Sequence, residues 1–131
     1  MIDDYKNYQI DNESLKIIMG INLENIKNKR IENTKIINKK LNKNSNIKFL
    51  VQEYNENDGL LFVPIILDTA VRDNLRKYLI ENQIYLPIHW PLEENINNIF
   101  QKELSLICDQ RYEISEIEKY INLILSYLNN K

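Results

Sequence analysis

The 131-residue sequence contains one cysteine, Cys108, and one histidine, His89. A single cysteine excludes a disulfide within the chain, and with it the small secreted folds that several disulfides hold together. One histidine without neighbouring cysteines or paired carboxylates falls short of the ligand set of a zinc site. We therefore expect neither a disulfide scaffold nor a metal centre.

The sequence also lacks an excess of positive charge, since 17 Lys and Arg face 19 Asp and Glu. Nucleic-acid binding needs a concentrated basic face, and the lysines between residues 27 and 43 are diluted by Glu32 and many asparagines. No apolar run approaches the roughly 20 residues of a membrane span, and no basic and apolar leader opens the sequence. We expect a cytoplasmic protein without a nucleic-acid or membrane partner.

Glycine is scarce as well, with only Gly20 and Gly59, which excludes a glycine-rich phosphate loop. What the chain does contain is ordinary for a globular protein, with 44% hydrophobic and 27% charged residues. A chain of this length can remove roughly two-thirds of its unfolded surface from water. We predict one domain over residues 21–131, preceded by a lead-in segment, residues 1–20, without sustained periodicity.

A long helix is predicted to begin after Asn22, a suitable N-cap. The spacing of three and four residues defines one face of it, made of Leu23, Ile26, Arg30, Asn33, Ile37 and Leu41. Buried polar groups must be paired, so we expect Arg30 and Asn33 to hydrogen-bond to the backbone of a neighbouring element. Residues 42–46 then end the helix.

Two strands are predicted next, over residues 47–54 and 60–67, joined by a turn that contains Asp58-Gly59, a strong hairpin signal. Pro64 lacks the amide hydrogen that a ladder needs, so we expect it at an edge strand or a bulge. A helix capped by Asp68 or Thr69 follows and stops at residues 81–83.

A third strand is predicted over residues 84–88 and a fourth over residues 104–108. Residues 93–102 fit a short helix or an irregular loop equally well. Residues 109–112 form a polar turn, and Ser115 with Glu118 resembles a capping box that opens the last helix. The order α-β-β-α-β-β-α predicts a small α+β domain, an antiparallel or mixed sheet with helices packed on one face.

The segment Ile84-Tyr85-Leu86-Pro87-Ile88-His89-Trp90-Pro91-Leu92 is the most informative part of the chain. It places the only histidine beside the only tryptophan, between two prolines. A stiff apolar segment that presents one titratable ring and one large aromatic ring is typical of the wall of a binding site.

Five sequence segments, read in order, together resemble one known pattern: Arg30-x-x-Asn33, Phe62-Val63-Pro64-Ile65, residues 72–79, Tyr85 to Pro91, and Leu104 to Tyr112. The pattern is that of the C-terminal small domain of the DegT-type aminotransferases. These enzymes use pyridoxal phosphate (PLP) and act mostly on nucleotide-linked keto sugars. The resemblance covers nearly the whole chain from about Leu23 onward, and it depends on the joint order of the segments rather than on one motif.

In that family the large N-terminal domain carries the Schiff-base lysine, the acid that pairs with the pyridine nitrogen, and the phosphate-binding backbone. None of these can be located here. Ser14-Leu15-Lys16 resembles the Ser-x-Lys context of such a lysine, but it follows no buried strand and has no glycine-rich turn beside it. The resemblance therefore implies PLP in the full-length enzyme, no cofactor on this chain alone, and no catalytic residues in it. The implied partner is a missing large domain or a separately encoded one, and a homodimer stays open.

The resemblance implies that His89 contacts substrate at the mouth of the cleft between the two domains. The alternative is a structural histidine whose ring nitrogens meet backbone carbonyls at a strand end. Trp90 could stack on a sugar or nucleotide, or pack at a domain interface, which we favour.

Arg111 could clamp a carboxylate or phosphate, or it could stiffen the turn by an ion pair with Asp109 or Glu113. Cys108 is expected to be a small buried hydrophobic residue. With a single histidine far from it in sequence, no Cys-His-acid nucleophile can be argued.

Two functions remain from these observations. The first is the small domain of a PLP-dependent sugar aminotransferase that contributes His89, Trp90 and Arg111 to a composite site. The second is a stand-alone interaction or scaffold module that kept the fold without catalysis.

Overall fold

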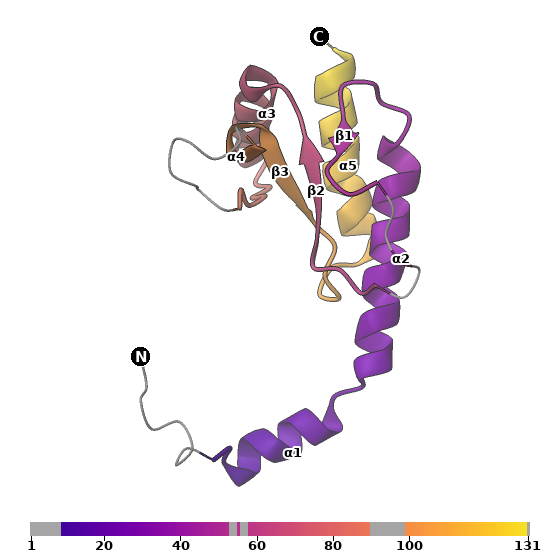
Figure 1. Cartoon of the computed structure of the whole chain (residues 1–131), viewed down its shortest axis with the longest axis vertical. Helices are drawn as coiled ribbons and strands as arrows, with labels where there is room; N and C mark the ends of the chain where they lie inside the picture. The colour runs from indigo at the N-terminus through magenta and orange to yellow at the C-terminus, as the bar shows by residue number, and fades with distance from the viewer. Residues whose placement is uncertain (1–8, 53–54, 56–57, 90–98, 131) are drawn as a thin grey trace.

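The computed structural model describes residues 9–52, 55, 58–89 and 99–130. Their elements follow one another as α1 (Asn12–Gly20), α2 (Leu23–Leu41), β1 (Lys48–Phe49), β2 (Phe62–Ile66), α3 (Thr69–Glu81), α4 (Ile99–Lys102), β3 (Glu103–Ile107) and α5 (Ile114–Asn129). Figure 1 shows α1 projecting from one end of a body that the other elements form. No helix in these ranges is both long and apolar enough to cross a membrane.

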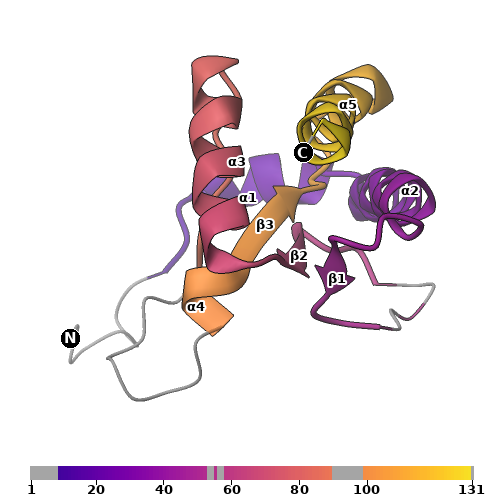
Figure 2. The same ribbon diagram turned by 90° about the horizontal axis from the view of Figure 1, so that it is seen from above.

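The sheet has three strands in the order β1-β2-β3, and both pairs are antiparallel. In the longer pair, Phe62 lies opposite Ile107 and Ile66 opposite Glu103. Seen from above in Figure 2, α2, α3 and α5 lie on the same side of the sheet. The predicted α+β class is confirmed, and the sheet is antiparallel rather than mixed.

The core lies between the sheet and these three helices. Alternate side chains point to opposite faces of a strand, so Val63 and Ile65 of β2 and Leu104 and Leu106 of β3 all enter the core. The helices contribute a larger apolar set that is also fully buried, made of Ile37, Leu41, Leu75, Leu79, Ile117, Ile121 and Ile124. Ile37 and Leu41 of this set belong to the helix face that the sequence predicts.

Two buried polar residues connect the helices to the sheet. Asn33 of α2 is fully buried, and its amide nitrogen lies 3.0 Å from the carbonyl oxygen of Asp109 and 3.1 Å from that of Tyr112. Arg72 of α3 is also buried, and it donates to the carbonyl of Glu103. The prediction that Asn33 hydrogen-bonds to a neighbouring backbone is confirmed.

Pro64 does not lie in an edge strand, because β2 is the middle strand of the sheet. Its position is tolerated because the missing hydrogen bond falls on the side of β1. The amide of Leu50 donates to the Pro64 carbonyl at 3.1 Å, but Pro64 has no hydrogen to return. The strand predicted over residues 47–54 is accordingly only two residues long and ends at Phe49.

The third strand predicted over residues 84–88 is not formed. Residues 84–89 run without regular secondary structure, and the Ser105 amide donates to the Pro87 carbonyl at 3.0 Å. Because Pro87 has no amide hydrogen, it cannot return a ladder bond. The observed order therefore lacks the third predicted strand and gains two helices, α1 and α4.

Helix α1 lies in the segment that the sequence analysis treated as a lead-in. The Asp11 carboxylate caps it by accepting from the amides of Glu13 and Ser14. None of its residues is buried. A helix that buries nothing against its own chain has no apolar stripe aimed at a local core, which explains why periodicity did not reveal it.

The remaining helix ends follow the predictions with one exception. Helix α3 begins after Asp68 and ends at the predicted stop, where Gln83 adopts a left-handed conformation with φ of 63°. The N-cap of helix α5 lies two residues before the predicted one: its capping box is formed by Glu113 and Glu116 rather than by Ser115 and Glu118. Residues 99–102 of the undecided segment are helical, whereas residues 93–98 lie outside the described ranges.

Asn33→Ala is expected to lower the free energy of unfolding by about 1–3 kcal/mol, because buried carbonyls of the turn after β3 lose their donor. Asn28→Ala is the matched control, since Asn28 lies exposed on the same helix and should change stability little. Urea unfolding followed by far-ultraviolet circular dichroism measures both. Equal stability of the two variants would contradict the role of Asn33.

Cys108 supplies a pH-dependent prediction. Burial raises the pKa of its thiol from 9.0 to about 11. In the unfolded chain the thiol ionises at lower pH, so the stability that Cys108 contributes is complete below about pH 9 and is lost as pH rises toward 11. The excess stability of the native sequence over Cys108→Ala should therefore fall by up to about 1.4 kcal/mol per pH unit in this range. A difference independent of pH, measured by urea unfolding, would argue against the shift.

Candidate ligand-binding groove on the open face of the sheet

The side of the sheet that faces away from α2, α3 and α5 is the candidate functional surface. The β2 side chains that alternate with the core residues, Phe62, Pro64 and Ile66, are only partly buried there. A groove of about 690 Å³ lies over the first part of β2, and its lining includes Arg30, Phe62, Pro64, His89 and Ser105. We call it the His89 groove.

His89 is held against β3 by two hydrogen bonds. Its backbone amide donates to Oε2 of Glu103 at 3.0 Å, and its ring Nδ1 lies 2.8 Å from Oγ of Ser105. The Ser105 hydroxyl in turn donates to Oε1 of Glu103 at 2.5 Å. In the alternative of a structural histidine, the ring nitrogens are expected to meet backbone carbonyls, and for Nδ1 the partner is instead a hydroxyl.

These three residues do not form a hydrolytic triad, although their types suggest one. In such a triad the acid binds the histidine ring and the histidine accepts the serine proton. Here the carboxylate of Glu103 binds the serine and the backbone of His89 instead. Ser105 is only 2% exposed, which also removes it from attack on a ligand.

The apolar wall of the His89 groove packs directly on the histidine. The rings of Phe62 and His89 have centroids 4.6 Å apart and planes tilted by 59°. Leu61 and Val51 add exposed apolar surface nearby in the same lining, at 46% and 40% exposure. The groove therefore combines aliphatic and aromatic surface with a small number of polar groups, as ligand sites commonly do.

Arg30 brings a positive charge to the other side of this groove. Its Nε donates to Oε1 of Gln110 at 2.7 Å, and its Nη1 lies 3.5 Å from the carbonyl oxygen of Gly59. The predicted bond from Arg30 to a neighbouring backbone is thus present but long, and its shorter bond goes to a side chain. Arg30 connects the groove to the turn at residues 109–112.

Arg111 forms the ion pair that was one of its two predicted roles. Its Nε lies 3.0 Å and 3.1 Å from the two carboxylate oxygens of Asp109, and Nη2 also contacts that carboxylate. Hydrogen bonds from the Arg111 side chain hold the pKa of the Asp109 carboxyl below its ordinary value. Arg111 does not line the His89 groove, so the structure does not bring these two candidates together.

Trp90, the third candidate, lies outside the described residues. Cys108 is fully buried, and its Sγ lies 3.4 Å from the carbonyl oxygen of Leu60. It is a core residue, as predicted.

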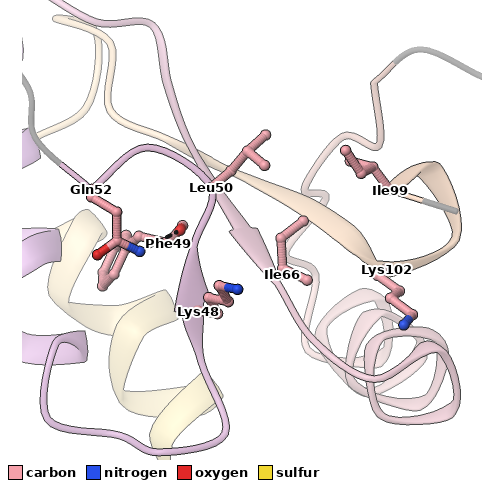
Figure 3. A pocket seen from close by; sticks show the side chains of 7 residues that line it. All are labelled: Lys48, Phe49, Leu50, Gln52, Ile66, Ile99 and Lys102. Atoms are coloured by element: carbon pink, nitrogen blue, oxygen red, sulfur yellow. Dashed lines mark hydrogen bonds between the residues drawn. The ribbon is translucent and has the colours of Figure 1, made fainter. Parts of the chain in front are cut away.

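A second groove, of about 580 Å³, lies farther along the same face. Figure 3 shows Ile66 of β2 between the side chains of Lys48 and Lys102, with Leu50 and Ile99 beside it. Both lysines are exposed to solvent. An imine-forming lysine must lose its proton near neutral pH, which requires burial or a neighbouring cation.

A PLP site does not fit the lining of either groove. Lys16, Lys48 and Lys102 are all exposed, and the lining of the His89 groove contains no lysine. Within the described ranges, no group of three His, Cys, Asp or Glu side chains could hold a metal ion. The chemistry that the groove supports is hydrogen bonding and apolar contact with a ligand.

Among the residues around the His89 groove, the sequence predicts a site role for His89 but not for Glu103, Ser105 and Phe62. A signal for the first two was present, because Glu103-Leu104-Ser105-Leu106 alternates polar and apolar residues. That alternation predicts a strand with one polar face, and the structure buries this polar face as well as the apolar one. The position of Phe62 beside His89 depends on how residues 84–89 cross the sheet, which local sequence does not specify.

No family model matches the sequence, and no curated protein matches it either. Solved structures do match. The aminotransferase TlmJ from Streptoalloteichus hindustanus has a TM-score of 0.75 at 15% identity, over 89% of this chain and 35% of that one. Spr1654 from Streptococcus pneumoniae, named as a sugar aminotransferase and solved in its PMP form, has a TM-score of 0.71 at 12% identity, over 89% and 34%.

NtdA from Bacillus subtilis, solved with bound PMP, matches with a TM-score of 0.64 at 13% identity, over 77% of this chain and 28% of that one. The chain thus spans about a third of the length of the solved structures that it matches. At these identities the comparisons establish the fold and not the activity. The resemblance inferred from the sequence is confirmed at that level: the chain has the fold of one part of the sugar aminotransferases.

Proposed function

We propose that this chain is the C-terminal small domain of a PLP-dependent aminotransferase of the DegT type, and that it acts in the cytoplasm on nucleotide-linked keto sugars. The observation that carries the proposal is the fold similarity, which extends over 77–89% of this chain and about a third of each enzyme. On this proposal the chain alone is inactive, because the lysine that holds the cofactor belongs to the large domain. Its role is to complete one wall of a substrate cleft.

The surface of α1 supports a missing partner. Four of its apolar side chains are between 41% and 79% exposed: Leu15, Ile17, Ile18 and Met19. Monomeric proteins rarely leave contiguous apolar surface uncovered, and such surface commonly marks an interface. We propose that the large domain covers this surface of α1. The large domain is either part of the same polypeptide or a separate subunit.

Within the composite cleft, His89 is the substrate contact of this domain, and Trp90 packs at the interface between the two domains. His89 lines the groove on the open face, where its imidazole can exchange a hydrogen bond with a sugar hydroxyl. The apolar surface of Phe62 beside it suits the carbon face of a sugar ring. Arg111 contributes less to this proposal, because Asp109 already occupies its guanidinium and would compete with an anionic substrate.

The first test adds PLP to the chain alone and then to the chain combined with any large-domain sequence encoded beside it, joined or separate. We expect an internal-aldimine absorbance band, reducible by borohydride, only from the combination. In the combination, His89→Ala should raise KM about tenfold, the equivalent of one lost hydrogen bond. Tyr85→Phe is the control, since Tyr85 is exposed on the same segment.

An imine formed by the chain alone would overturn the assignment of the cofactor to the large domain. Absence of any large-domain sequence beside this chain, or of a band from the combination, would overturn the proposal. The outcome would then favour the stand-alone scaffold module.

The second test concerns α1. Ile18→Lys should abolish co-purification of this chain with the large domain, whereas Lys16→Ala, on the same helix, should not. Because α1 contains no buried residue, both variants should keep the thermal unfolding midpoint of the native sequence. Retained binding by Ile18→Lys would show that α1 is not the docking surface.

A further inference from the structure

The hydrogen bonds around His89 determine which of its ring nitrogens carries the proton, and therefore which groups the ring can bind. Glu103 and Ser105 project from β3 beneath residues 87–89 and are only 1% and 2% exposed. Both carboxylate oxygens of Glu103 are engaged: Oε2 accepts from the His89 amide, and Oε1 accepts from the Ser105 hydroxyl. An ionised carboxylate can only accept, so this arrangement suits its ionised form.

The direction of the remaining bond follows from the count of hydrogens. A serine hydroxyl has one hydrogen and can accept further bonds through its lone pairs. Because that hydrogen points to Glu103, the 2.8 Å contact between Ser105 Oγ and His89 Nδ1 requires the hydrogen to be on Nδ1. If Glu103 were protonated, its carboxyl would donate to Ser105 Oγ, and the Ser105 hydroxyl would donate to Nδ1 of His89. The hydrogen of the neutral ring would then lie on Nε2.

We propose that Ser105 and Glu103 are positioning residues that hold the neutral imidazole of His89 with its proton on Nδ1, and thus make Nε2 a hydrogen-bond acceptor. The ring is also held in orientation by its contact with Phe62 and by the backbone bond to Glu103. The tautomer of His89 is therefore set from β3, at the floor of the groove.

This arrangement determines which chemical groups suit the histidine, and that consequence depends on the proposed role of His89 as a substrate contact. A neutral ring with the proton on Nδ1 accepts through Nε2 from a hydroxyl or an ammonium group. It offers no hydrogen through Nε2 to a carbonyl or phosphate oxygen. Any group that bonds to Nε2 of the neutral ring, whether of this chain or of a ligand, is therefore a donor such as a hydroxyl, rather than the oxygen of a keto or phosphate group.

The tautomer can be measured directly because His89 is the only histidine of the chain. The whole chain is labelled with ¹⁵N, and long-range ¹H-¹⁵N correlation spectra are recorded over a pH series that reaches the neutral ring. We expect a pyrrole-type Nδ1 and a pyridine-type Nε2. Ser105→Ala removes the acceptor of Nδ1 and should move the ring proton to Nε2, whereas Ser105→Thr keeps the hydroxyl and should keep the native pattern.

The native spectrum is decisive even if Ser105→Ala does not fold. A neutral ring protonated on Nε2 in the native chain would overturn the proposal, and so would a Ser105→Ala chain that keeps the proton on Nδ1. The measurement needs neither cofactor nor large domain. Its failure would leave the proposed aminotransferase role standing, and failure of that role would leave the tautomer assignment standing.

Discussion

The burial of strand β3 on both of its faces is the constraint on which the rest of the structure depends. Leu104 and Leu106 face the helices, and Glu103 and Ser105 face residues 87–89. An apolar face can be covered by any well-packed helix, but a buried carboxylate and a buried hydroxyl need specific partners. The partners are the backbone and ring of His89, so the polar face of β3 determines where the histidine lies.

Hydrogen bonds to buried polar groups also hold the end of β3 in place. The turn at residues 109–112 exposes carbonyls to the interior, and Asn33 of α2 donates to them. Asp109 on this turn is buried and paired with Arg111, and Gln110 binds Arg30 at the margin of the groove. Helix α2, the turn and the groove are therefore one connected unit, in which polar side chains supply the directional contacts and the apolar core supplies most of the burial.

This architecture separates two surfaces with different roles. The open face of the sheet carries the His89 groove, where hydrogen-bonding groups are fixed from below by β3. Helix α1 carries exposed apolar side chains, and none of its residues is buried. A domain with one prepared groove and one uncovered apolar helix is consistent with half of a composite site, which is the function we propose.

The sequence by itself determined the helices with a core-facing stripe and the α+β class, because periodicity is a local property. It also identified His89 as the residue of interest and Asn33 as a buried polar group that needs a backbone partner. Only the tertiary structure decided that Pro64 is central, that residues 84–88 do not pair as a strand, and that Ser105 and Glu103 hold His89. These features depend on contacts between residues far apart in the chain, where the missing amide hydrogen of a proline or the single hydrogen of a hydroxyl selects one arrangement.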